Sequence, residues 1–478
     1  MVFIKNLTWQ SMLFCLVLAA LFVSAFSYGT SPFYVNHAFS DSAMFQVIGK
    51  GWAEGSLPYV DLWDSKGPLI FFINALGFLL TGSATGIYII QILSLTITFA
   101  VCYVWMCDVF GRRGAVLSCI LLFLALPLNY DFGNMTEEYL LPLLMLSFYL
   151  IYKWATESYD NGNMEHPARY SLIYGALLGC SLMTRLTNAV GVLTAVAFIC
   201  VCLVYKRLWF CLLRNALFFL IGFIVVVLPF VVYFGSKGIL HDMWYGTFIY
   251  NVKYASHSLS HLTPDMFVYS FYRYAPCMLL VAVSLLIFVR YRKAMLWLSV
   301  SAVTLVYLLM SLGFYHYGMI CLPYLCVSVV LLFKYLSSPR LRLKVTCVAV
   351  LMFFSYTFID KLYFALTNKN DFIADYNEMI ASVPPHERSS IMSYGCDAGF
   401  YVWFDILPEY RFFTFQDWAA SNDTKLVGEL RKEFSDGDVK YILFCGNPDN
   451  TYIGDIMSRR YEIIKRNPSA DLWLLRLR

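Results

Sequence analysis

The sequence predicts an all-α polytopic membrane protein with about eleven transmembrane helices, followed by a small C-terminal α/β soluble domain. Composition is the first observation, because 60% of the 478 residues are hydrophobic and only 14% are charged, which is too apolar for a soluble globule. The second is a series of apolar stretches near the length of about 20 residues that crosses a bilayer. The third is a polar, acidic tail, which divides the chain into residues 1–366 and 367–478.

Charge distribution predicts the orientation of these segments. The predicted spans are residues 9–28, 85–107, 114–130, 137–154, 170–185, 188–205, 212–234, 269–289, 294–312, 316–334 and 344–362. Lysine and arginine are retained on the cytoplasmic side of membrane proteins, and with a cytoplasmic N-terminus that side holds 15 of them against seven outside. We therefore expect an integral protein of the bacterial inner membrane whose first outer loop and C-terminal domain are both periplasmic, or otherwise lumenal or extracellular.

The tail alternates strand-like and helix-like segments. The strand-like runs are "SSIMSYG", "EYRFFTF", "VKYILFCG" and "DLWLLRLR", and "DTKLVGELRKEF" between them has a helical pattern. This alternation is typical of an α/β domain. Its two cysteines, Cys396 and Cys445, would pair in an oxidising compartment or else remain separate core residues, and the sequence leaves both possibilities open.

The first outer loop carries the chemistry that stands out most. In "FSDSAMFQVIGKGWAEGSLPYVDLWDSKGPLIFF", Ser40 is expected to cap a helix whose first turn holds Asp41. Its apolar face comprises Met44, Val47, Ile48 and Trp52. With Gln46 and Lys50 on the opposite face, the helix should lie along the membrane surface. The apolar residues 69–80 are too few to span and predict a second interfacial helix.

Other charged and aromatic residues are predicted at the outer ends of the spans. Glu137 and Glu138 either complement a helix dipole or face a cavity, where one of them binds an acceptor or supports Asp41. Arg185 interrupts an apolar run, which is costly unless it contacts a phosphate or pairs with an outer acid. Tyr315 and His316 are either interface residues or part of a site.

Five segments resemble the GT-C superfamily of membrane glycosyltransferases, in its protein O-mannosyltransferase-like branch that includes lipid A aminoarabinose transferases. They are "SDSAMFQVIGKGWAEGSLPYVDLWDSKGPL", "GNMTEEYLLPLL", "LMTRLTNAVGVL", "FIYNVKY" and "YHYGMICLPYL". The similarity covers roughly residues 1–340, and the first of these segments is the most specific. Gly67 departs from the pattern, because the family usually has proline after the lysine.

The resemblance implies transfer of a sugar from a polyprenyl-phosphate-linked donor to a lipid, glycan or protein hydroxyl at the outer membrane face, with inversion. By the same resemblance Asp41 is the general base, and Lys66, with Arg185, binds the donor phosphate. The other candidates are acceptor-binding or supporting residues: Asp61, Asp64, Glu137, Glu138, Tyr315 and His316. No cofactor is required and no metal ligand is assigned, although an incidental divalent ion is compatible with these acids.

Two competing functions come from other classes. A multi-span transporter or flippase of a lipid-linked or small polar substrate also carries charged residues in its spans. Against it, the predicted spans are almost free of charge in their middle portions and the charges gather at one face. The other competitor is an assembly or scaffold protein with a soluble interaction domain, which sequence alone does not exclude.

Overall fold

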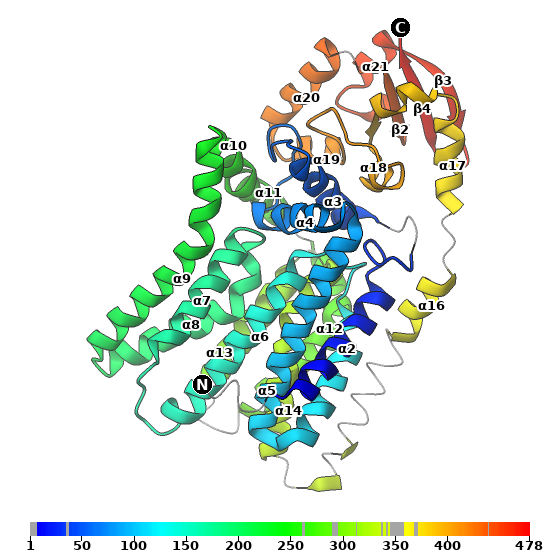
Figure 1. The fold of residues 1–478 in the computed structure, drawn as a ribbon. Helices are drawn as coiled ribbons and strands as arrows, with labels where there is room; N and C mark the ends of the chain where they lie inside the picture. Colours follow the sequence, from blue (N-terminus) through cyan, green and yellow to red (C-terminus); the bar gives the residue numbers. More distant parts are fainter. Residues whose placement is uncertain are drawn as a thin grey trace. The chain divides into compact units, whose positions relative to one another are not determined.

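A computed structural model describes residues 7–34, 38–260, 263–288, 295–311, 313–335, 338–340, 343–344, 358–367, 371–437 and 439–478. The chain divides into two compact units (Figure 1). The first comprises Met1–Ser27, Ile89–Tyr233 and Leu262–Leu366. The second comprises Tyr28–Tyr88, Phe234–His261 and Thr367–Arg478, so the first outer loop and the tail belong to one unit.

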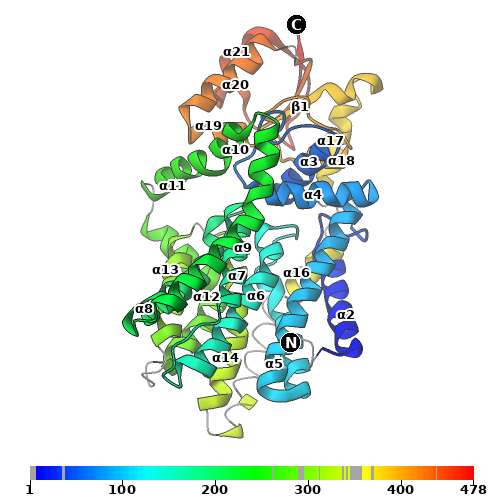
Figure 2. The same cartoon turned by 60° about the vertical axis from the view of Figure 1, so that its left-hand side comes forward.

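The first unit is built from apolar helices. They are α2 (Trp9–Phe26), α5 (Ala84–Ala125), η1 (Leu126–Leu128), α6 (Thr136–Trp154), η2 (Ala155–Tyr159), α7 (Ala168–Leu182), η3 (Leu186–Ala189), α8 (Val190–Tyr205), α9 (Trp209–Ser236), α12 (Pro264–Phe288), α13 (Met295–Met310), η6 (Tyr315–Cys321), α14 (Leu322–Tyr335) and α16 (Ile359–Thr367). Helices α6, α7 and α8 pack against one another, and α13 packs on α8 (Figures 1 and 2). The division falls within three of these helices, since the start of α5 and the ends of α9 and α16 belong to the second unit.

These helices agree with the predicted spans wherever the structure describes them. Among the described residues, five helical segments are long and apolar enough to cross a membrane: Trp9–Phe26, Ala84–Leu128, Thr136–Tyr159, Leu186–Tyr205 and Trp209–Ser236. The predicted spans 85–107 and 114–130 both fall on α5, which is interrupted at Gly111, where φ is 71° and ψ is −176°. The predicted span 344–362 lies largely outside the described residues. The count of eleven stays a prediction.

Helix α9 shows why the chain needs a lipid environment. Its outward side chains are large, apolar and exposed, among them Phe210, Leu213, Leu217, Val225 and Val232. A soluble protein rarely exposes so continuous an apolar surface, whereas hydrocarbon tails cover one without cost. The chain is therefore an integral membrane protein, as its composition predicts.

Helices α3 (Ser40–Ala53) and α4 (Pro68–Thr81) of the second unit confirm the two short helices predicted in the first outer loop. They lie side by side (Figure 2). They approach closely at Gly49, where a Cβ atom would lie 2.4 Å from Cβ of Asn74. The predicted polar face of α3 is wrong for Gln46, whose exposed fraction is 1%. Its amide donates hydrogen bonds to Gly29 O at 3.1 Å and Ser42 Oγ at 3.3 Å, so this side of α3 also packs against protein.

The predicted cap of α3 also needs correction. Ser40 is the first helical residue, and the N-cap position belongs to Phe39, whose side chain has no hydrogen-bonding group. The backbone N–H of Ser40 donates instead to the Asp397 carboxylate at 2.7 Å. The cap therefore comes from a residue far away in the sequence.

The tail contains the predicted α/β structure. Its sheet has the order β1-β2-β4-β3, with β1 (Ile391–Tyr394) parallel to β2 (Tyr441–Cys445). Strand β4 (Leu472–Leu477) runs antiparallel to β2 and to β3 (Tyr461–Asn467). The accompanying helices are α17 (Asp371–Ile380), η8 (Pro385–Ser390), α18 (Gly399–Trp403), α19 (Gln416–Ser421), α20 (Thr424–Asp436), η9 (Pro448–Asn450) and α21 (Gly454–Arg460).

The strand predicted at "EYRFFTF" is wrong. Phe412 and Phe413 are buried in the core, but the carbonyl groups of this segment do not accept hydrogen bonds from the backbone of a neighbouring strand. The Gln416 amide donates to Phe412 O, the Ser393 hydroxyl donates to Phe413 O, and the Trp63 backbone N–H donates to Arg411 O. Burial in an irregular segment therefore gives the same apolar pattern as a strand.

All three segments of the second unit share one hydrophobic core. Trp63 of the first loop packs with Tyr250 at 4.9 Å between ring centroids and with Phe412 at 5.8 Å. Tyr250 begins α11 (Tyr250–Ser260), which follows α10 (Leu240–Trp244) and η4 (Tyr245–Ile249). The same core includes Met392, Phe444 and Leu426 of the tail. The tail and the first outer loop therefore fold together.

Candidate active site

Asp41 and Lys66 form an ion pair within the second unit. Asp41 lies in the first turn of α3, and Lys66 lies two residues before α4 begins at Pro68. Lys66 Nζ is 3.5 Å from Asp41 Oδ2, and the side chains are 23% and 25% exposed, respectively. The two residues with the clearest predicted chemistry thus meet at a position that a substrate can reach.

Asp64 is a second carboxylate beside the same lysine, in a different environment. Its side chain is buried, and its Oδ2 accepts a hydrogen bond from the Lys66 backbone N–H at 3.3 Å. Burial raises the pKa of Asp64 above its usual range, while the charge of Lys66 opposes this rise and the charge of Asp41 adds to it. Because Asp64 is buried and its carboxylate binds the Lys66 backbone, it suits a supporting position better than one that meets a substrate hydroxyl.

Three residues that the sequence analysis did not single out hold the Lys66 segment in place. The buried Tyr59 donates its phenol proton to Lys66 O at 2.8 Å and lies 3.2 Å from Thr247 Oγ1. Asn251 donates its side-chain amide to Ser65 O at 2.5 Å. The sequence signals were the family-like segments that contain them, "SDSAMFQVIGKGWAEGSLPYVDLWDSKGPL" for Tyr59 and "FIYNVKY" for Asn251. Asn251 and Ser65 are far apart in sequence, and no local pattern marks their contact.

Asp61 and Gly67 have local structural surroundings. Asp61 is exposed, and its Oδ2 accepts a hydrogen bond from Leu57 N at 2.7 Å, which closes the turn before the site. Gly67 is the N-cap residue of α4 with φ −70° and ψ 157°. This φ is the one that a proline ring imposes. The departure from the family pattern at Gly67 therefore leaves the backbone in a conformation that proline would also adopt.

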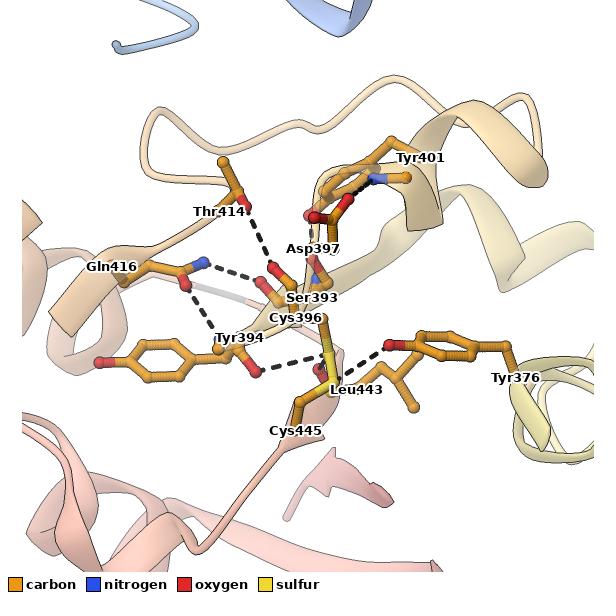
Figure 3. Close-up of a disulfide and its surroundings, with 12 residues drawn as sticks. Tyr376, Ser393, Tyr394, Cys396, Asp397, Tyr401, Thr414, Gln416, Leu443 and Cys445 are labelled. Carbon is orange, nitrogen blue, oxygen red and sulfur yellow. Dashed lines mark hydrogen bonds between the residues drawn. A yellow bond between two sulfur atoms is a disulfide. The ribbon is translucent and has the colours of Figure 1, made fainter. Parts of the chain in front are cut away.

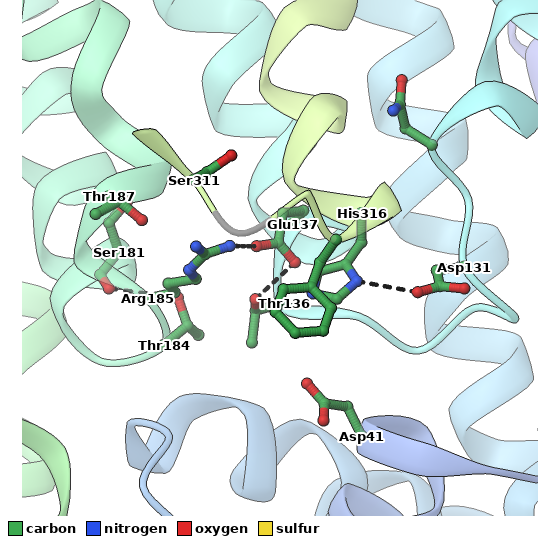
Figure 4. A network of polar contacts seen from close by, with 12 residues as sticks. Asp41, Asp131, Thr136, Glu137, Ser181, Thr184, Arg185, Thr187, Ser311 and His316 are labelled. Carbon is green, nitrogen blue, oxygen red and sulfur yellow. Dashed lines mark hydrogen bonds and ion pairs between the residues drawn. The ribbon is translucent and has the colours of Figure 1, made fainter. Parts of the chain in front are cut away.

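A second polar network belongs to the first unit (Figure 4). Glu137 at the start of α6 is fully buried, and it accepts hydrogen bonds from Arg185 Nη1 at 3.1 Å and from the Thr136 hydroxyl at 2.8 Å. The Arg185 guanidinium also lies 3.0 Å from the ring centroid of Tyr317. Arg185 was predicted either to contact a phosphate or to pair with an outer acid, and in this structure it pairs with the acid Glu137.

His316 and Asp131 lie in the same network (Figure 4). His316 Nδ1 is 3.2 Å from Asp131 Oδ2, and the imidazole is largely buried. Burial would raise the pKa of Asp131, but the hydrogen bond and charge of His316, together with nearby cations, hold it below its usual range. Asp131 was not predicted as a site residue, because a single acid in an outer loop is commonly just solvated.

Glu138, next to Glu137, has different partners. It is buried and accepts hydrogen bonds from the Tyr130 hydroxyl at 2.7 Å, the Gln91 amide at 2.9 Å and the Asn134 backbone at 2.9 Å. Such complete pairing is what a buried carboxylate needs in order to be tolerated. Glu138 therefore connects α5, α6 and the turn between them.

Tyr315 lines a cavity of about 430 Å³ in the first unit. Two cations approach its ring, with Arg273 Cζ 3.2 Å and Lys361 Nζ 5.5 Å from the ring centroid. The other lining residues are Leu128, Asn129, Tyr269, Tyr272, Pro276, Cys277 and Asp360. Arg273 and Lys361 are among the seven basic residues predicted on the outer side, and neither was predicted as a site residue. Across the described parts of the chain, no group of three His, Cys, Asp or Glu side chains is arranged to hold a metal ion.

Comparison with known proteins confirms the predicted resemblance. Residues 65–234, less than half of the chain, match the family model described as dolichyl-phosphate-mannose-protein mannosyltransferase. No curated protein matches the sequence.

Two solved structures share the fold. ArnT from Cupriavidus metallidurans in the apo state matches with a TM-score of 0.58 at 12% identity, covering 98% of each chain. The same protein bound to undecaprenyl phosphate matches with a TM-score of 0.53 at 14% identity, again covering 98% of each chain. At these identities the comparison establishes the fold. That fold is the one predicted from the five sequence segments.

Proposed function

We propose that this chain, which has the fold of a GT-C membrane glycosyltransferase, transfers a sugar from a polyprenyl-phosphate-linked donor to an acceptor hydroxyl. The observation that carries the proposal is the Asp41–Lys66 pair at 3.5 Å, partly exposed at the starts of two helices. A carboxylate and an ammonium group so placed match the two needs of the reaction, a base for the hydroxyl and a cation for the phosphate. The undecaprenyl phosphate bound by the structural relative ArnT supports this class of donor.

The proposed reaction is a single displacement. The acceptor hydroxyl attacks the anomeric carbon, Asp41 takes the hydroxyl proton, and the bond from carbon to phosphate oxygen breaks with its electron pair left on the phosphate. Attack opposite the leaving group inverts the anomeric centre. Lys66 stabilises the charge that develops on the departing phosphate oxygen.

The contacts around Lys66 support its assignment. The backbone of residues 65–66 is held by hydrogen bonds to Asp64, Tyr59 and Asn251. The backbone that carries the Lys66 side chain is therefore fixed in position. When a donor phosphate binds, Lys66 exchanges part of its contact with Asp41 for the phosphate. Asp41 is then released to accept a proton.

The network in the first unit is proposed to bind substrate as well. Arg185 uses one terminal nitrogen for Glu137, and a guanidinium has further donors that suit a phosphate. Glu137 orients Arg185, and Glu138, Tyr315 and His316 are the proposed acceptor or supporting contacts of the first unit. Asp61 and Asp64 are those proposed for the second unit. No cofactor enters the reaction as proposed, and a divalent ion would be incidental.

The proposed location is the bacterial inner membrane, with eleven spans, a cytoplasmic N-terminus and a periplasmic C-terminal domain. The positive charge of the inner loops supports this orientation. The disulfide Cys396–Cys445 also supports it, because disulfides persist in oxidising compartments (Figure 3). The acceptor is a lipid, a glycan or a protein exposed on that side.

The test uses purified full-length protein and undecaprenyl phosphate carrying a radiolabelled sugar. Wild-type protein should transfer the label to membrane acceptors, and Asp41→Asn should abolish transfer. Glu54→Gln, at the exposed C-terminal end of α3, is the matched control and should retain activity. Equal transfer by wild type and Asp41→Asn would exclude Asp41 as the base. Solute counterflow in vesicles without any transfer would instead establish a transporter.

A further inference from the structure

We infer that Asp397 of the tail is a positioning residue for Asp41, because its carboxylate fixes the backbone at the start of α3. The inference rests on the proposed function, in which Asp41 is the base. It assigns to the C-terminal segment a part in the reaction that neither the family match nor the shared fold supplies. The residues that carry it all belong to the second unit.

The Asp397 carboxylate joins two backbone segments. Its Oδ2 accepts a hydrogen bond from Ser40 N at 2.7 Å, and its Oδ1 accepts one from Gly399 N at 2.7 Å. Both lengths are short for N–H···O bonds, as expected for a charged acceptor. The residue after Ser40 is Asp41, so the carboxylate holds the peptide group between Phe39 and Ser40, one residue before the proposed base.

The start of α3 depends on this contact. Ser40 has φ 51°, a left-handed conformation that costs free energy for a residue with a side chain. The N-cap position is occupied by Phe39, which has no polar side-chain atom to accept a backbone N–H. Asp397 supplies the missing acceptor and places a negative charge at the helix N-terminus, where the helix dipole favours it.

Further contacts fix the same two segments together. The Trp403 indole N–H donates to Ala38 O at 3.0 Å, and the Trp403 and Phe39 rings lie 5.5 Å apart. At Gly399 a Cβ atom would lie 2.5 Å from Ala38 O, so only glycine allows this approach. The geometry around residues 38–41 is therefore set by α18 and the loop before it.

That loop is itself firmly held (Figure 3). Cys396, directly before Asp397, is bonded to Cys445 at the end of β2. The Thr414 hydroxyl donates to Cys396 O at 3.0 Å, and the Gly395 N–H donates to the Gln416 side-chain oxygen at 3.0 Å. A rigid support of this kind is what a positioning residue requires, because displacement of about 1 Å can cost roughly 100-fold in rate.

The test measures transfer by full-length Asp397→Ala and Asp397→Asn proteins. Alanine removes both acceptors, so kcat should fall about 10- to 100-fold while the donor KM changes little. Asparagine keeps one acceptor oxygen but loses the second one and the negative charge, so its kcat should fall a few-fold, less than that of the alanine variant. The control is Asp405→Asn, which disrupts the 2.7 Å pair between Asp405 and Lys50 near the other end of α3. It should leave kcat unchanged.

The outcomes separate this inference from the proposed function. If Asp41→Asn is inactive while Asp397→Ala matches wild type in kcat, the positioning inference is wrong and the proposed function stands. If Asp41→Asn transfers sugar at the wild-type rate, Asp41 is not the base and this inference loses its premise. If wild type transfers no sugar, the proposed function itself fails. If Asp397→Ala does not fold, Asp397→Asn decides the question: an unfolding midpoint like wild type with reduced kcat supports positioning, and unchanged kcat overturns it.

Discussion

At the scale of single residues, the site contrasts two carboxylates around one lysine. Asp41 is partly exposed and 3.5 Å from Lys66 Nζ, whereas Asp64 is buried and bonded to the Lys66 backbone. Burial raises the pKa of Asp64. The two acids are therefore suited to different tasks although they lie in one sequence motif.

Substitution of these acids should separate the tasks. Asp41→Asn removes the proposed base and should lower kcat by roughly 100- to 10,000-fold, the usual contribution of general base catalysis. Asp64→Asn keeps the shape and the hydrogen bond to Lys66 N, so kcat should fall only a few-fold. Steady-state transfer assays measure both. A larger loss for Asp64→Asn than for Asp41→Asn would reverse the assignment.

The sequence was sufficient to find Asp41 and Lys66, because both lie in one compact motif with a known family pattern. It did not indicate Asp397, and it indicated no role for Tyr59 or Asn251, although these two lie in family-like segments. Each of these acts through a hydrogen bond to a residue distant in the chain or to a backbone atom. Such contacts leave no periodicity or composition bias in a single sequence.

At the scale of elements, the close contact of α3 and α4 is needed to bring Asp41 and Lys66 together. Gly49→Ala would place a Cβ atom 2.4 Å from Asn74 Cβ and 2.8 Å from the Asn74 carbonyl carbon. We expect a loss of stability of about 1–3 kcal/mol from overpacking and a fall in transfer activity.

Thermal unfolding of the purified protein measures the loss of stability of Gly49→Ala. The matched control is Gly428→Ala in α20, where the new methyl group meets open space and should stabilise the helix by about 0.5–1 kcal/mol. Equal stability of Gly49→Ala and wild type would mean that the two helices separate without cost.

Helix α20 also carries a pH-sensitive carboxyl group. Burial raises the pKa of Glu433 to about 7, Arg411 opposes the rise, and Glu429 adds to it. The folded state therefore holds a proton that the unfolded chain releases at lower pH. The resulting stabilisation is complete below the ordinary pKa of a glutamate and is lost as the pH rises through about 7.

Unfolding midpoints between pH 5 and pH 8 test this assignment. The midpoint of wild type should fall across the range more steeply than that of Glu433→Gln, which has no titrating group at this position. Parallel curves for the two proteins would show that Glu433 does not titrate there.

Element boundaries show where pattern reading succeeds and fails. Helix α20 follows its predicted segment because its apolar residues recur at helical spacing. Strands β1, β2 and β4 follow theirs because each is a short, mostly buried run. Strand β3 was missed, since adjacent Ile463 and Ile464 break the alternation where the pairing register shifts. At residues 409–415 a strand was predicted where none exists, because apolar residues buried in irregular backbone resemble a strand in sequence.

At the scale of the whole molecule, composition alone predicted the membrane protein, but not the division into units. The first outer loop, residues 234–261 and the tail share a core, and Trp63 N donates to Arg411 O at 3.0 Å. Hydropathy predicts which segments are buried in the membrane or the protein core, but it does not predict which distant segments pack against one another.

The disulfide is the covalent link within this shared unit. The double variant Cys396→Ser, Cys445→Ser should destabilise the second unit by about 2–4 kcal/mol, because the bond closes a loop of 49 residues. Transfer activity should fall with it, since Cys396 adjoins Asp397. Differential scanning with and without reductant measures the effect, and an unfolding profile insensitive to reductant would contradict it.

The most direct measurement of the central claim is the anomeric configuration of the transferred sugar, determined by NMR on the product of wild-type and Asp41→Asn proteins. A single displacement with Asp41 as base predicts an inverted anomeric centre for wild type and product formation at least about 100-fold slower for Asp41→Asn. A product with retained configuration, or one formed at the wild-type rate by Asp41→Asn, would contradict it.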